Sequence, residues 1–391
     1  MTLNRATLTE VNLEAFRHNL RTIKSLVGPS VGTMAIIKAD AYGHGATQCA
    51  FAAIKEGVNY LGVGIIQEGI ELRENRITSP ILVLGGVYPN EVEDLIKYNL
   101  STSLSTSALA HAISKQAEHA GKNVGVHIKI DTGMGRLGVQ PSDFAGLLDN
   151  VTSYKNLKIE GIFTHLACAD EENPETTHHQ VSNFSKVLKE LGTENFSTLT
   201  STNESLLVHS ANTAGLLRFP ESRFNMVRPG ISLFGSLPSP VLNPVFGSLV
   251  KKNGLAELRP VMCWKTKIIQ IQTLRKGVPL SYGGHHVTQK EGSRIATLPV
   301  GYADGLNRRL SNKMELLVKG TRVKQVGTIC MDMCLIDVTD LPNVKMGEEV
   351  VIFGSQGKAQ IRVEELAAKA ETVPYEILCG VGKRVPRIYI S

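Results

Sequence analysis

Short apolar runs alternate with amphipathic stretches through the first 235 residues of the chain. In the amphipathic stretches, such as NLEAFRHNLRTIKSL and VSNFSKVLKELG, apolar residues recur at the spacing of one helix face. The apolar runs have the length of buried strands, and strands that alternate with helices indicate a parallel sheet. Eight strands are predicted, at Gly32–Lys38, Tyr60–Ile65, Ile81–Gly85, Ser101–Leu104, Val124–Asp131, Lys158–Thr164, Leu206–Ser210 and Asn225–Arg228. Eight such units in this length predict a TIM barrel.

The pattern changes after Gly235. The segment SLPSPVLNPVFGSLVKKNGL is rich in Pro, Gly and Ser, which predicts a linker or loop. Beyond it, KIIQIQTL, RIATLPVGYADG, CMDMCLIDVTDL and EEVVIFG are short β-like runs between turn residues. At 391 residues the chain exceeds the usual size of one core. We therefore expect a barrel over residues 1–240 and a mainly-β domain over residues 241–391.

Composition narrows the classes of partner. The formal charge is +6, the pI is near 8.9, and no run of five like charges marks a nucleic-acid-binding tail. A small anionic ligand fits this mild charge better. The N-terminus has no continuous apolar segment, and no stretch of 18 apolar residues follows. The six cysteines are scattered without metal-binding spacing, so we expect free thiols, no metal, and a cytoplasmic protein with neither membrane nor nucleic acid as partner.

A lysine stands at the end of the first predicted strand, in MAIIKADAYGHGA. Reactive groups of TIM barrels lie at this end of the strands, although a single lysine there is commonly a surface charge. The loops after strands seven and eight, HSANTAG and VRPGIS, combine hydroxyls, small residues and glycine. Either loop alone fits ordinary turn and cap chemistry. Together, in the two places where these barrels bind phosphate, they favour a phosphorylated ligand.

Lys38 facing a phosphate site indicates pyridoxal 5'-phosphate, because the coenzyme's aldehyde needs an amine. Arg228 is then a candidate partner for the ring nitrogen. A guanidinium keeps its proton, so it would leave that nitrogen unprotonated and the ring a weaker electron sink. Such a ring favours simple proton exchange. By itself, Arg228 could equally be a surface ion-pair residue.

Nine segments in order resemble the successive motifs of bacterial alanine racemases. They are IIKADAYGHGA, HIKIDTGMGRLG, EGIFTHLACAD, HSANTAG, NMVRPGISLFG, LSYGG, LPVGYADG, ICMDM and PYEILCGVGKRVPRIY. The resemblance extends from about residue 5 to the C-terminus. It implies a homodimeric pyridoxal-phosphate enzyme of fold type III that interconverts L- and D-alanine and supplies D-alanine for peptidoglycan.

The resemblance also assigns roles to single residues. It implies that Lys38 binds the coenzyme and acts as a base, and that His165 lies beneath the ring and bonds Arg228. The residues implied to contact the coenzyme phosphate or lie beside it are Tyr42, Asn212, Thr213, Gly230, Ile231 and Tyr375.

Tyr282 matches the second base of the family, delivered by the partner subunit. A racemase needs a base on each face of a planar carbanion, and one side chain cannot reach both. The usual pKa of tyrosine, about 10, is high for this task, so the site must lower it; the His165 and Arg228 pair is the expected relay. The residues implied to contact or enclose the substrate are Arg136, Tyr302, Met331 and Asp332, with Met331 and Asp332 crossing the dimer interface.

Lys129 shares a predicted strand face with His127 and Asp131. A lone ammonium inside a barrel is costly, and near Arg136 it would add repulsion. Carbamylation would reverse its sign and give Arg136 an anionic partner, as the resemblance implies for several members. The alternative is a simple pair between Lys129 and Asp131.

The chain departs from the family pattern at a few places. Thr328 stands where arginine is common, Met333 where glutamine is usual, and Phe234 where tyrosine is common. The segment TENFSTLTSTNES is longer than usual. We expect these differences to change the entrance and the substrate range without touching the predicted chemistry.

Three other functions stay open at this point. A broader amino-acid racemase acting on serine is possible, because a small apolar pocket rejects a hydroxyl poorly. A coenzyme-carrying barrel without turnover would have no need for Tyr282, Met331 and Tyr302. A decarboxylase of similar architecture is the third alternative, and none of the motifs favours it.

Overall fold

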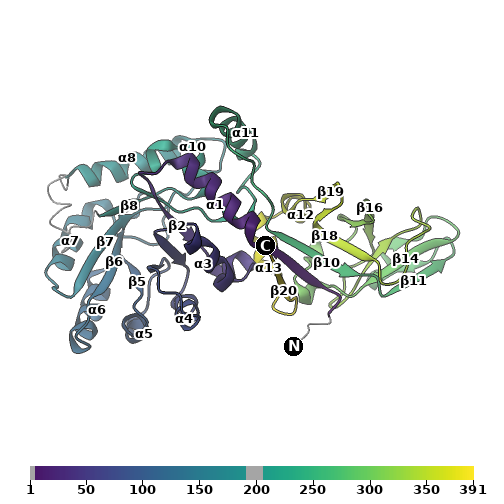
Figure 1. The fold of residues 1–391 in the computed structure, drawn as a ribbon, viewed down its shortest axis with the longest axis horizontal. Coiled ribbons are helices and arrows are strands. Elements are labelled where there is room, and N and C mark those ends of the chain that lie inside the picture. The colour runs from purple at the N-terminus through teal and green to yellow at the C-terminus, as the bar shows by residue number, and fades with distance from the viewer. Residues whose placement is uncertain (1–4, 191–205) are drawn as a thin grey trace.

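The computed structural model describes residues 5–190 and 206–391. Figure 1 shows two lobes side by side, a barrel of strands enclosed by helices and a lobe built mainly of strands. The segment TENFSTLTSTNES lies outside the described residues. Among the described residues, no helix has both the length and the apolar character of a membrane span.

The first lobe is a parallel eight-stranded barrel. Its strands are β2 (Gly32–Ile36), β3 (Tyr60–Val63), β4 (Ile81–Val83), β5 (Ser101–Leu104), β6 (Val124–Lys129), β7 (Leu157–Phe163), β8 (Leu207–His209) and β9 (Met226–Val227). They pair in chain order from β2 to β8, and β9 pairs with β2. The Asn225 side chain joins β8 to the segment before β9, accepting from the backbone nitrogen of Val208 at 2.7 Å. The TIM barrel and its eight strands are confirmed.

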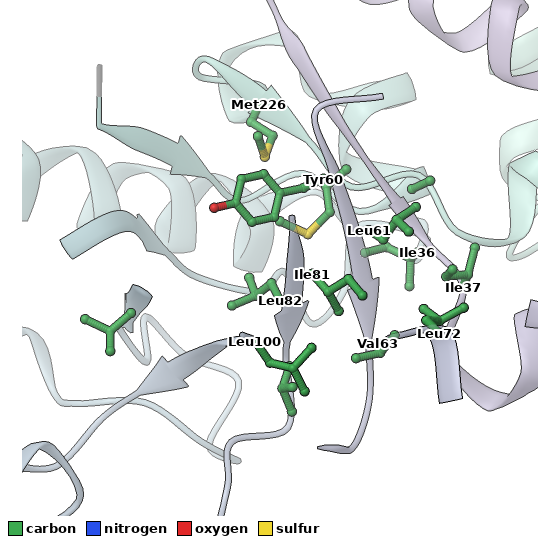
Figure 2. Close-up of a cluster of buried hydrophobic side chains, with 14 of the residues drawn as sticks. Ile36, Ile37, Tyr60, Leu61, Val63, Leu72, Ile81, Leu82, Leu100 and Met226 are labelled. Atoms are coloured by element: carbon green, nitrogen blue, oxygen red, sulfur yellow. The ribbon is translucent and has the colours of Figure 1, made fainter. Parts of the chain in front are cut away.

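Helices cover the outside of the barrel (Figure 1). They are α1 (Leu13–Val27), α3 (Ala46–Lys55), α4 (Ile66–Glu74), α5 (Val92–Lys97), α6 (Ser107–His119), α7 (Phe144–Thr152), α8 (Glu175–Glu190) and α10 (Thr213–Arg218). Helix α1 shows why they form: Asn12 caps its first turn, and Phe16, Leu20 and Ile23 bury one face. Figure 2 shows buried apolar side chains of β2, β3 and β4, such as Ile36, Leu61 and Leu82, gathered in one cluster.

The second lobe is a ten-stranded sheet in the order β11, β14, β17, β16, β15, β18, β10, β1 and β20, with β19 beside β18. The strands are β10 (Met262–Lys267), β11 (Gln270–Leu274), β14 (Ser293–Leu298), β15 (Glu315–Val318), β16 (Thr321–Val326), β17 (Cys334–Asp337), β18 (Glu349–Gln356), β19 (Ala359–Ile361) and β20 (Arg387–Ile390). A hairpin of β12 (Pro279–Leu280) and β13 (His286–Val287), and helices α12 (Val363–Ala370) and α13 (Pro374–Gly380), complete this lobe. The predicted mainly-β domain is confirmed.

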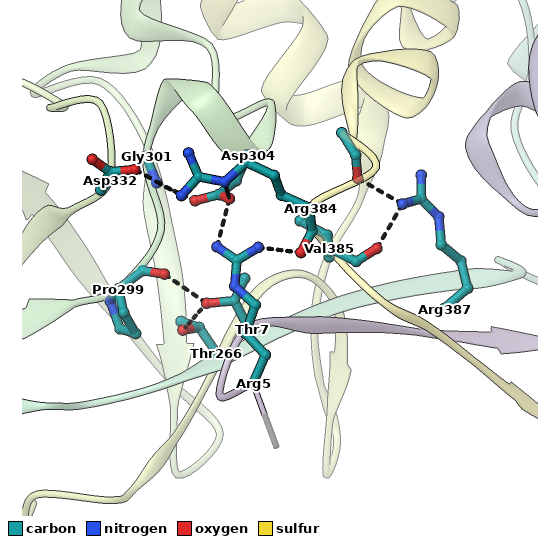
Figure 3. A network of polar contacts seen from close by, with 11 residues as sticks. Arg5, Thr7, Thr266, Pro299, Gly301, Asp304, Asp332, Arg384, Val385 and Arg387 are labelled. Carbon is teal, nitrogen blue, oxygen red and sulfur yellow. Dashed lines mark hydrogen bonds and ion pairs between the residues drawn. The ribbon is translucent and has the colours of Figure 1, made fainter. Parts of the chain in front are cut away.

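Strand β1 (Leu8–Asn12) belongs to this second sheet. It pairs antiparallel with β10 and parallel with β20. The sequence analysis placed residues 1–240 with the barrel, so the structure corrects that assignment for residues 8–12. Thr9 and Val11 alternate inward, and Thr7 before them bonds the Thr266 hydroxyl at 2.8 Å and the Pro299 carbonyl at 2.7 Å (Figure 3).

The predicted linker after Gly235 is also corrected, because it contains helix α11 (Leu242–Asn253). Pro244 stands in the first turn, where its missing N–H has no helical partner to lose. Gly254 ends the helix in the left-handed conformation, and Leu242 and Phe246 are buried against the barrel side. The Pro, Gly and Ser content of this segment predicted a loop, whereas its few apolar residues at helical spacing, Leu242 and Phe246 among them, form the buried face of a helix.

Candidate active site

A cavity of about 650 Å³ opens at the C-terminal ends of the barrel strands. This is the end where TIM barrels hold their active sites, and the volume suits a small coenzyme or substrate. The predicted residues that line it are Lys38, Tyr42, Lys129, Arg136, His165, Asn212, Thr213, Arg228, Gly230 and Tyr375. The fold therefore gathers ten predicted residues from the C-terminal ends of five strands, β2, β6, β7, β8 and β9, and from helix α13.

Lys38 follows β2 after one residue, Ile37, and begins the segment α2 (Lys38–Gly43). Four residues of this segment, Ala39 to Tyr42, have φ near +53° and positive ψ, so it is a left-handed turn. That conformation costs roughly 1–2 kcal/mol for each non-glycine residue. Backbone strain of this kind clusters at functional sites, where surrounding contacts hold it.

Glu68 supplies contacts that hold the turn. Its two carboxylate oxygens each accept a hydrogen bond of 2.6 Å, one from the backbone nitrogen of Ala39 and one from that of Gly64. Asp40 adds a third clamp by accepting from the nitrogen of Ala46 at 2.7 Å. Sequence reasoning missed Glu68 because it lies in the first turn of α4, where an acidic residue is commonly a simple helix cap.

Burial is the largest cause that lowers the pKa of Lys38 below its usual value, followed by the charge of Arg136. The amine lies in the cavity and remains accessible to solvent. A lysine with a lowered pKa has more neutral amine available at neutral pH, which both nucleophilic attack and base catalysis require.

Hydroxyl groups gather at one end of the cavity. The rings of Tyr42 and Tyr375 lie 5.8 Å apart, and burial raises the pKa of both phenols, so each keeps its proton as a donor. Thr213 joins the two loops that were predicted to bind phosphate, since its hydroxyl oxygen accepts a hydrogen bond of 3.1 Å from the backbone nitrogen of Gly230. A Cβ at Gly230 would lie 2.5 Å from the Tyr42 hydroxyl oxygen, so glycine is needed for this approach.

Ile231 does not line the cavity. It is fully buried and begins the short helix η4 (Ile231–Phe234) directly after Gly230, so its backbone lies beside the hydroxyl cluster. Phe234 ends this helix and its ring lies 4.9 Å from that of Tyr42. The departure at Phe234 therefore contacts a predicted phosphate-binding tyrosine, contrary to expectation.

Arg228 lies at the bottom of the cavity with 3% of its surface exposed. Its guanidinium bonds Nδ1 of His209 at 2.7 Å, Nδ1 of His165 at 3.2 Å, and the carbonyls of Thr164 and Ser210. Burial is the largest cause that holds the pKa of His165 well below its usual value, followed by Arg228. Both effects favour the neutral imidazole, whose Nδ1 accepts the hydrogen bond from Arg228.

His209, which bonds Arg228, was not among the residues predicted for the site. A histidine ending a short apolar strand is commonly a satisfied core residue, so the strand alone carried no signal for a role beside Arg228.

Lys129 points into the cavity with 6% of its surface exposed, 5.5 Å from the ring of Phe163. Burial and then Arg136 lower its pKa to about 8. Asp131, its alternative partner, accepts instead from the backbone nitrogens of residues 133–135, and the described residues show no ion pair between Lys129 and Asp131. Among the described residues, the Lys129 ammonium therefore lies near the Arg136 cation without an ion pair to a carboxylate.

Five predicted or discussed residues lie away from this cavity, on the second lobe. The exposed fractions are 73% for Tyr282, 43% for Tyr302, 53% for Met331 and 47% for Met333, and Asp332 is also exposed. Backbone bonds join Tyr302 to Cys330 and Ala303 to Met331. Asp332 accepts from Arg384 at 2.7 Å (Figure 3). Exposed large apolar side chains gathered in this way are typical of an interaction surface.

Thr328 lies next to the turn that carries Tyr282. It is 5% exposed, and its hydroxyl donates to the carbonyl of Tyr282 at 2.8 Å. Ser281 in turn donates to the carbonyl of Thr328 at 2.7 Å. The expectation that Thr328 has no contact with the predicted chemistry is wrong, because it fixes the turn that carries Tyr282.

The site has the parts that a phosphorylated aldehyde coenzyme needs. It has an amine at a strand end, a hydroxyl cluster with a glycine that admits a close approach, and a buried guanidinium aimed into the same cavity. The residues present therefore fit such a group.

Comparisons with known proteins agree along the whole chain. The family model "Alanine racemase, N-terminal domain" matches residues 11–238, and "Alanine racemase, C-terminal domain" matches residues 261–389. The alanine racemase of Halothermothrix orenii is 40% identical over 388 residues, covering 99% of this chain and 97% of that protein. The alanine racemase of Desulfovibrio desulfuricans is 38% identical over 392 residues, covering all of both chains.

Solved structures give the same answer. The alanine racemase of Clostridium difficile 630 superposes with a TM-score of 0.89 at 37% identity, covering 100% of this chain and 97% of that chain. The resemblance seen in the motifs is thereby confirmed at the level of the complete fold. The chain belongs to the alanine racemase family, the isomerases that interconvert L-alanine and D-alanine.

Proposed function

We propose that this enzyme racemises alanine with two bases, Lys38 and Tyr282 of the partner subunit, on opposite faces of a pyridoxal-phosphate site. One observation carries the proposal: Lys38, Arg228 and the Tyr42 hydroxyl line one cavity, whereas Tyr282 is 73% exposed on the other lobe. A base that the chemistry needs, and that its own chain leaves outside the cavity, supports delivery across a homodimer.

The coenzyme would be held at three points. Lys38 would carry it covalently through Nζ, the hydroxyls of Tyr42, Tyr375 and Thr213 would bind its phosphate, and Arg228 would face its ring nitrogen. When bound, pyridoxal phosphate would withdraw the electron pair left on the α-carbon of alanine after deprotonation. Because Arg228 only donates, it would leave the ring nitrogen unprotonated and limit side reactions.

The residues of the chain divide the proton transfers. Lys38, with its lowered pKa, takes or returns the α-proton on one face. Tyr282 of the partner subunit would serve the opposite face, and His165, which is bonded to Arg228, is the expected proton relay to it. Arg136 would bind the substrate carboxylate through its planar fork of donors.

Lys129 would orient Arg136 as a carbamate. Its lowered pKa supports this proposal, because only the neutral amine reacts with carbon dioxide. Met331 and Asp332 would come from the partner subunit to the substrate, and Tyr302 would narrow the pocket at its entrance so that it suits a methyl side chain. We further propose that the enzyme is cytoplasmic and supplies D-alanine for peptidoglycan.

The direct test is α-hydrogen exchange in deuterated water, assayed together with chirality. L-alanine should lose its α-hydrogen and become racemic, and serine should react more slowly. Tyr282→Phe should lose racemisation yet retain exchange on D-alanine, the enantiomer whose proton faces Lys38. Equal exchange of both enantiomers by Tyr282→Phe would contradict the two-base site.

A further inference from the structure

A row of polar side chains runs through the barrel interior beneath Arg228. Arg228 Nη1 lies 2.7 Å from Nδ1 of His209, and Nε2 of His209 lies 2.9 Å from Nδ1 of His127. Nε2 of His127 then faces Oε2 of Glu160 at 3.9 Å. Arg228, His209 and His127 are buried, whereas the Glu160 side chain is 25% exposed. The row therefore leads from the cavity to a carboxylate near the opposite end of the barrel.

The donors and acceptors in this row determine which ring nitrogen of each histidine carries the proton. A guanidinium has donors only, so Nδ1 of His209 must accept, and the single proton of this neutral ring lies on Nε2. His209 therefore donates to Nδ1 of His127. The proton of His127 must then lie on Nε2, which has no hydrogen-bond partner in the described structure and faces Glu160.

Glu160 is held in place for this contact. The hydroxyls of Ser101 and Tyr60 donate to its Oε2 at 2.6 Å and 2.9 Å. Figure 2 shows the Tyr60 ring at the edge of an apolar cluster, with its hydroxyl directed away from the other labelled side chains. The pairing of β6 with β7 shifts register beside Glu160, which makes it the extra residue of a bulge.

Two glycines make room for the row. A Cβ at Gly125 would lie 2.2 Å from Oε2 of Glu160, and a Cβ at Gly161 would lie 2.4 Å from Nδ1 of His127. Any larger residue would displace the carboxylate or the imidazole. The strands β6 and β7 are therefore shaped around these two side chains.

In the part of the chain that the structure describes, Arg228 is a buried positive charge without a charged partner beside it, and the row of polar side chains connects it to a carboxylate. All four of its hydrogen-bond partners are neutral, and the described residues give it no ion pair, although an isolated buried charge is unfavourable. Burial lowers the pKa of Arg228 to about 9 and that of His127 to about 3, and it holds the pKa of His209 well below its usual value. Both histidines therefore stay uncharged near neutral pH. Two neutral imidazoles with aligned N–H dipoles can transmit the polarisation of a carboxylate.

We propose that Glu160, His127 and His209 are positioning residues that stabilise the charge of Arg228 and thereby keep it as the donor to the coenzyme ring nitrogen. This inference rests on the proposed role of Arg228. Loss of the Glu160 charge should weaken the polarisation of the row without removing any atom from the cavity.

The first measurement reads the proton positions in the full-length enzyme. Histidine labelled with ¹⁵N, assigned through the variants His127→Gln and His209→Gln, should show both rings as neutral Nε2–H tautomers, with and without coenzyme. An Nδ1–H tautomer or a charged ring at either position would overturn the row. This readout does not depend on turnover, so it separates the row from failure of the proposed function.

The second measurement removes the charge and keeps the shape. Glu160→Gln should shift the His127 and His209 resonances. It should also raise the ratio of transamination to racemisation about three- to tenfold, the effect of weakening the hydrogen bond that Arg228 would donate to the coenzyme ring nitrogen. Glu56→Gln is the matched control, since Glu56 pairs with Arg21 and its side chain is 15% exposed. The control should change neither readout.

Unchanged resonances and an unchanged ratio in a folded Glu160→Gln enzyme would overturn the proposal. Should that variant fail to fold, Ser101→Ala removes a donor to Glu160 and should shift the His127 resonance. Absence of that shift would count equally against the row.

Discussion

The hydroxyl of Thr328 donates a 2.8 Å hydrogen bond to the carbonyl oxygen of Tyr282, the residue proposed as the second base. Thr328→Val keeps the shape of the side chain but leaves this carbonyl without its donor. A neutral hydrogen bond contributes about 1 kcal/mol, so we expect racemisation to fall about fivefold. Thr328→Ser, which retains the hydroxyl, should keep most of the activity. Full activity in Thr328→Val together with a loss in Thr328→Ser would mean that the methyl group, rather than the bond, matters.

Lys38 should carry the coenzyme. Borohydride reduction followed by peptide mapping should find the pyridoxyl group on Lys38, at the end of β2. Lys38→Ala should lose both the label and at least about 10²-fold of the activity, because it removes the attachment point and one base together. A label on another lysine would contradict the assignment.

The proposed dimer predicts recovery of activity from two inactive variants. Lys38→Ala and Tyr282→Phe should each be inactive alone. After subunit exchange, the mixture should regain about one quarter of wild-type activity, because half of the dimers are mixed and each keeps one intact site of two. Exchange must be shown independently, for example with differently tagged subunits. If exchange occurs without recovery, both bases come from one chain.

Arg228 should restrain side reactions. Arg228→Glu would place a group able to hold a proton at the ring nitrogen, and we expect racemisation to slow about 10²-fold while transamination increases. The ratio of pyruvate formed to alanine racemised measures the partition. An unchanged ratio would remove Arg228 from this role, whatever the rate.

Lys129 should be carbamylated. Burial and Arg136 lower its pKa to about 8, so the fraction of neutral, reactive amine rises steeply with pH below 8, reaches about one half there and levels off above it. At a fixed concentration of dissolved carbon dioxide, reactivation of carbon-dioxide-depleted enzyme should therefore be slower at pH 6 than at pH 8. Incubation with ¹³C-labelled bicarbonate should give a carbamate signal that is absent from Lys129→Arg.

Removing Lys129 should leave Arg136 without its anionic partner. Lys129→Ala should lose about tenfold of the activity or more, and chloride or acetate should restore part of it by replacing the missing anion. Full activity in Lys129→Ala, or a high-resolution map without a carbamate, would mean that Arg136 is oriented by another group.

The sequence alone determined the features that depend on local periodicity and local chemistry. The eight barrel strands, the β-rich second lobe, and Lys38 at a strand end were all predicted, because buried strands and amphipathic helices leave regular patterns in nearby residues. The two loops proposed to bind phosphate were chosen for their positions after strands seven and eight. The resemblance of the motifs added residue roles that no single pattern could give.

Tertiary structure alone decided what depends on contacts between distant segments. Strand β1 joins the second sheet through partners more than 240 residues away, which no local pattern encodes. The left-handed turn after Lys38 depends on Glu68 from another helix, and Tyr282 lies outside its own chain's cavity. His127, His209 and Glu160 converge because three neighbouring strands of one barrel set their registers and leave space at two glycines, a condition that packing fixes and sequence spacing does not.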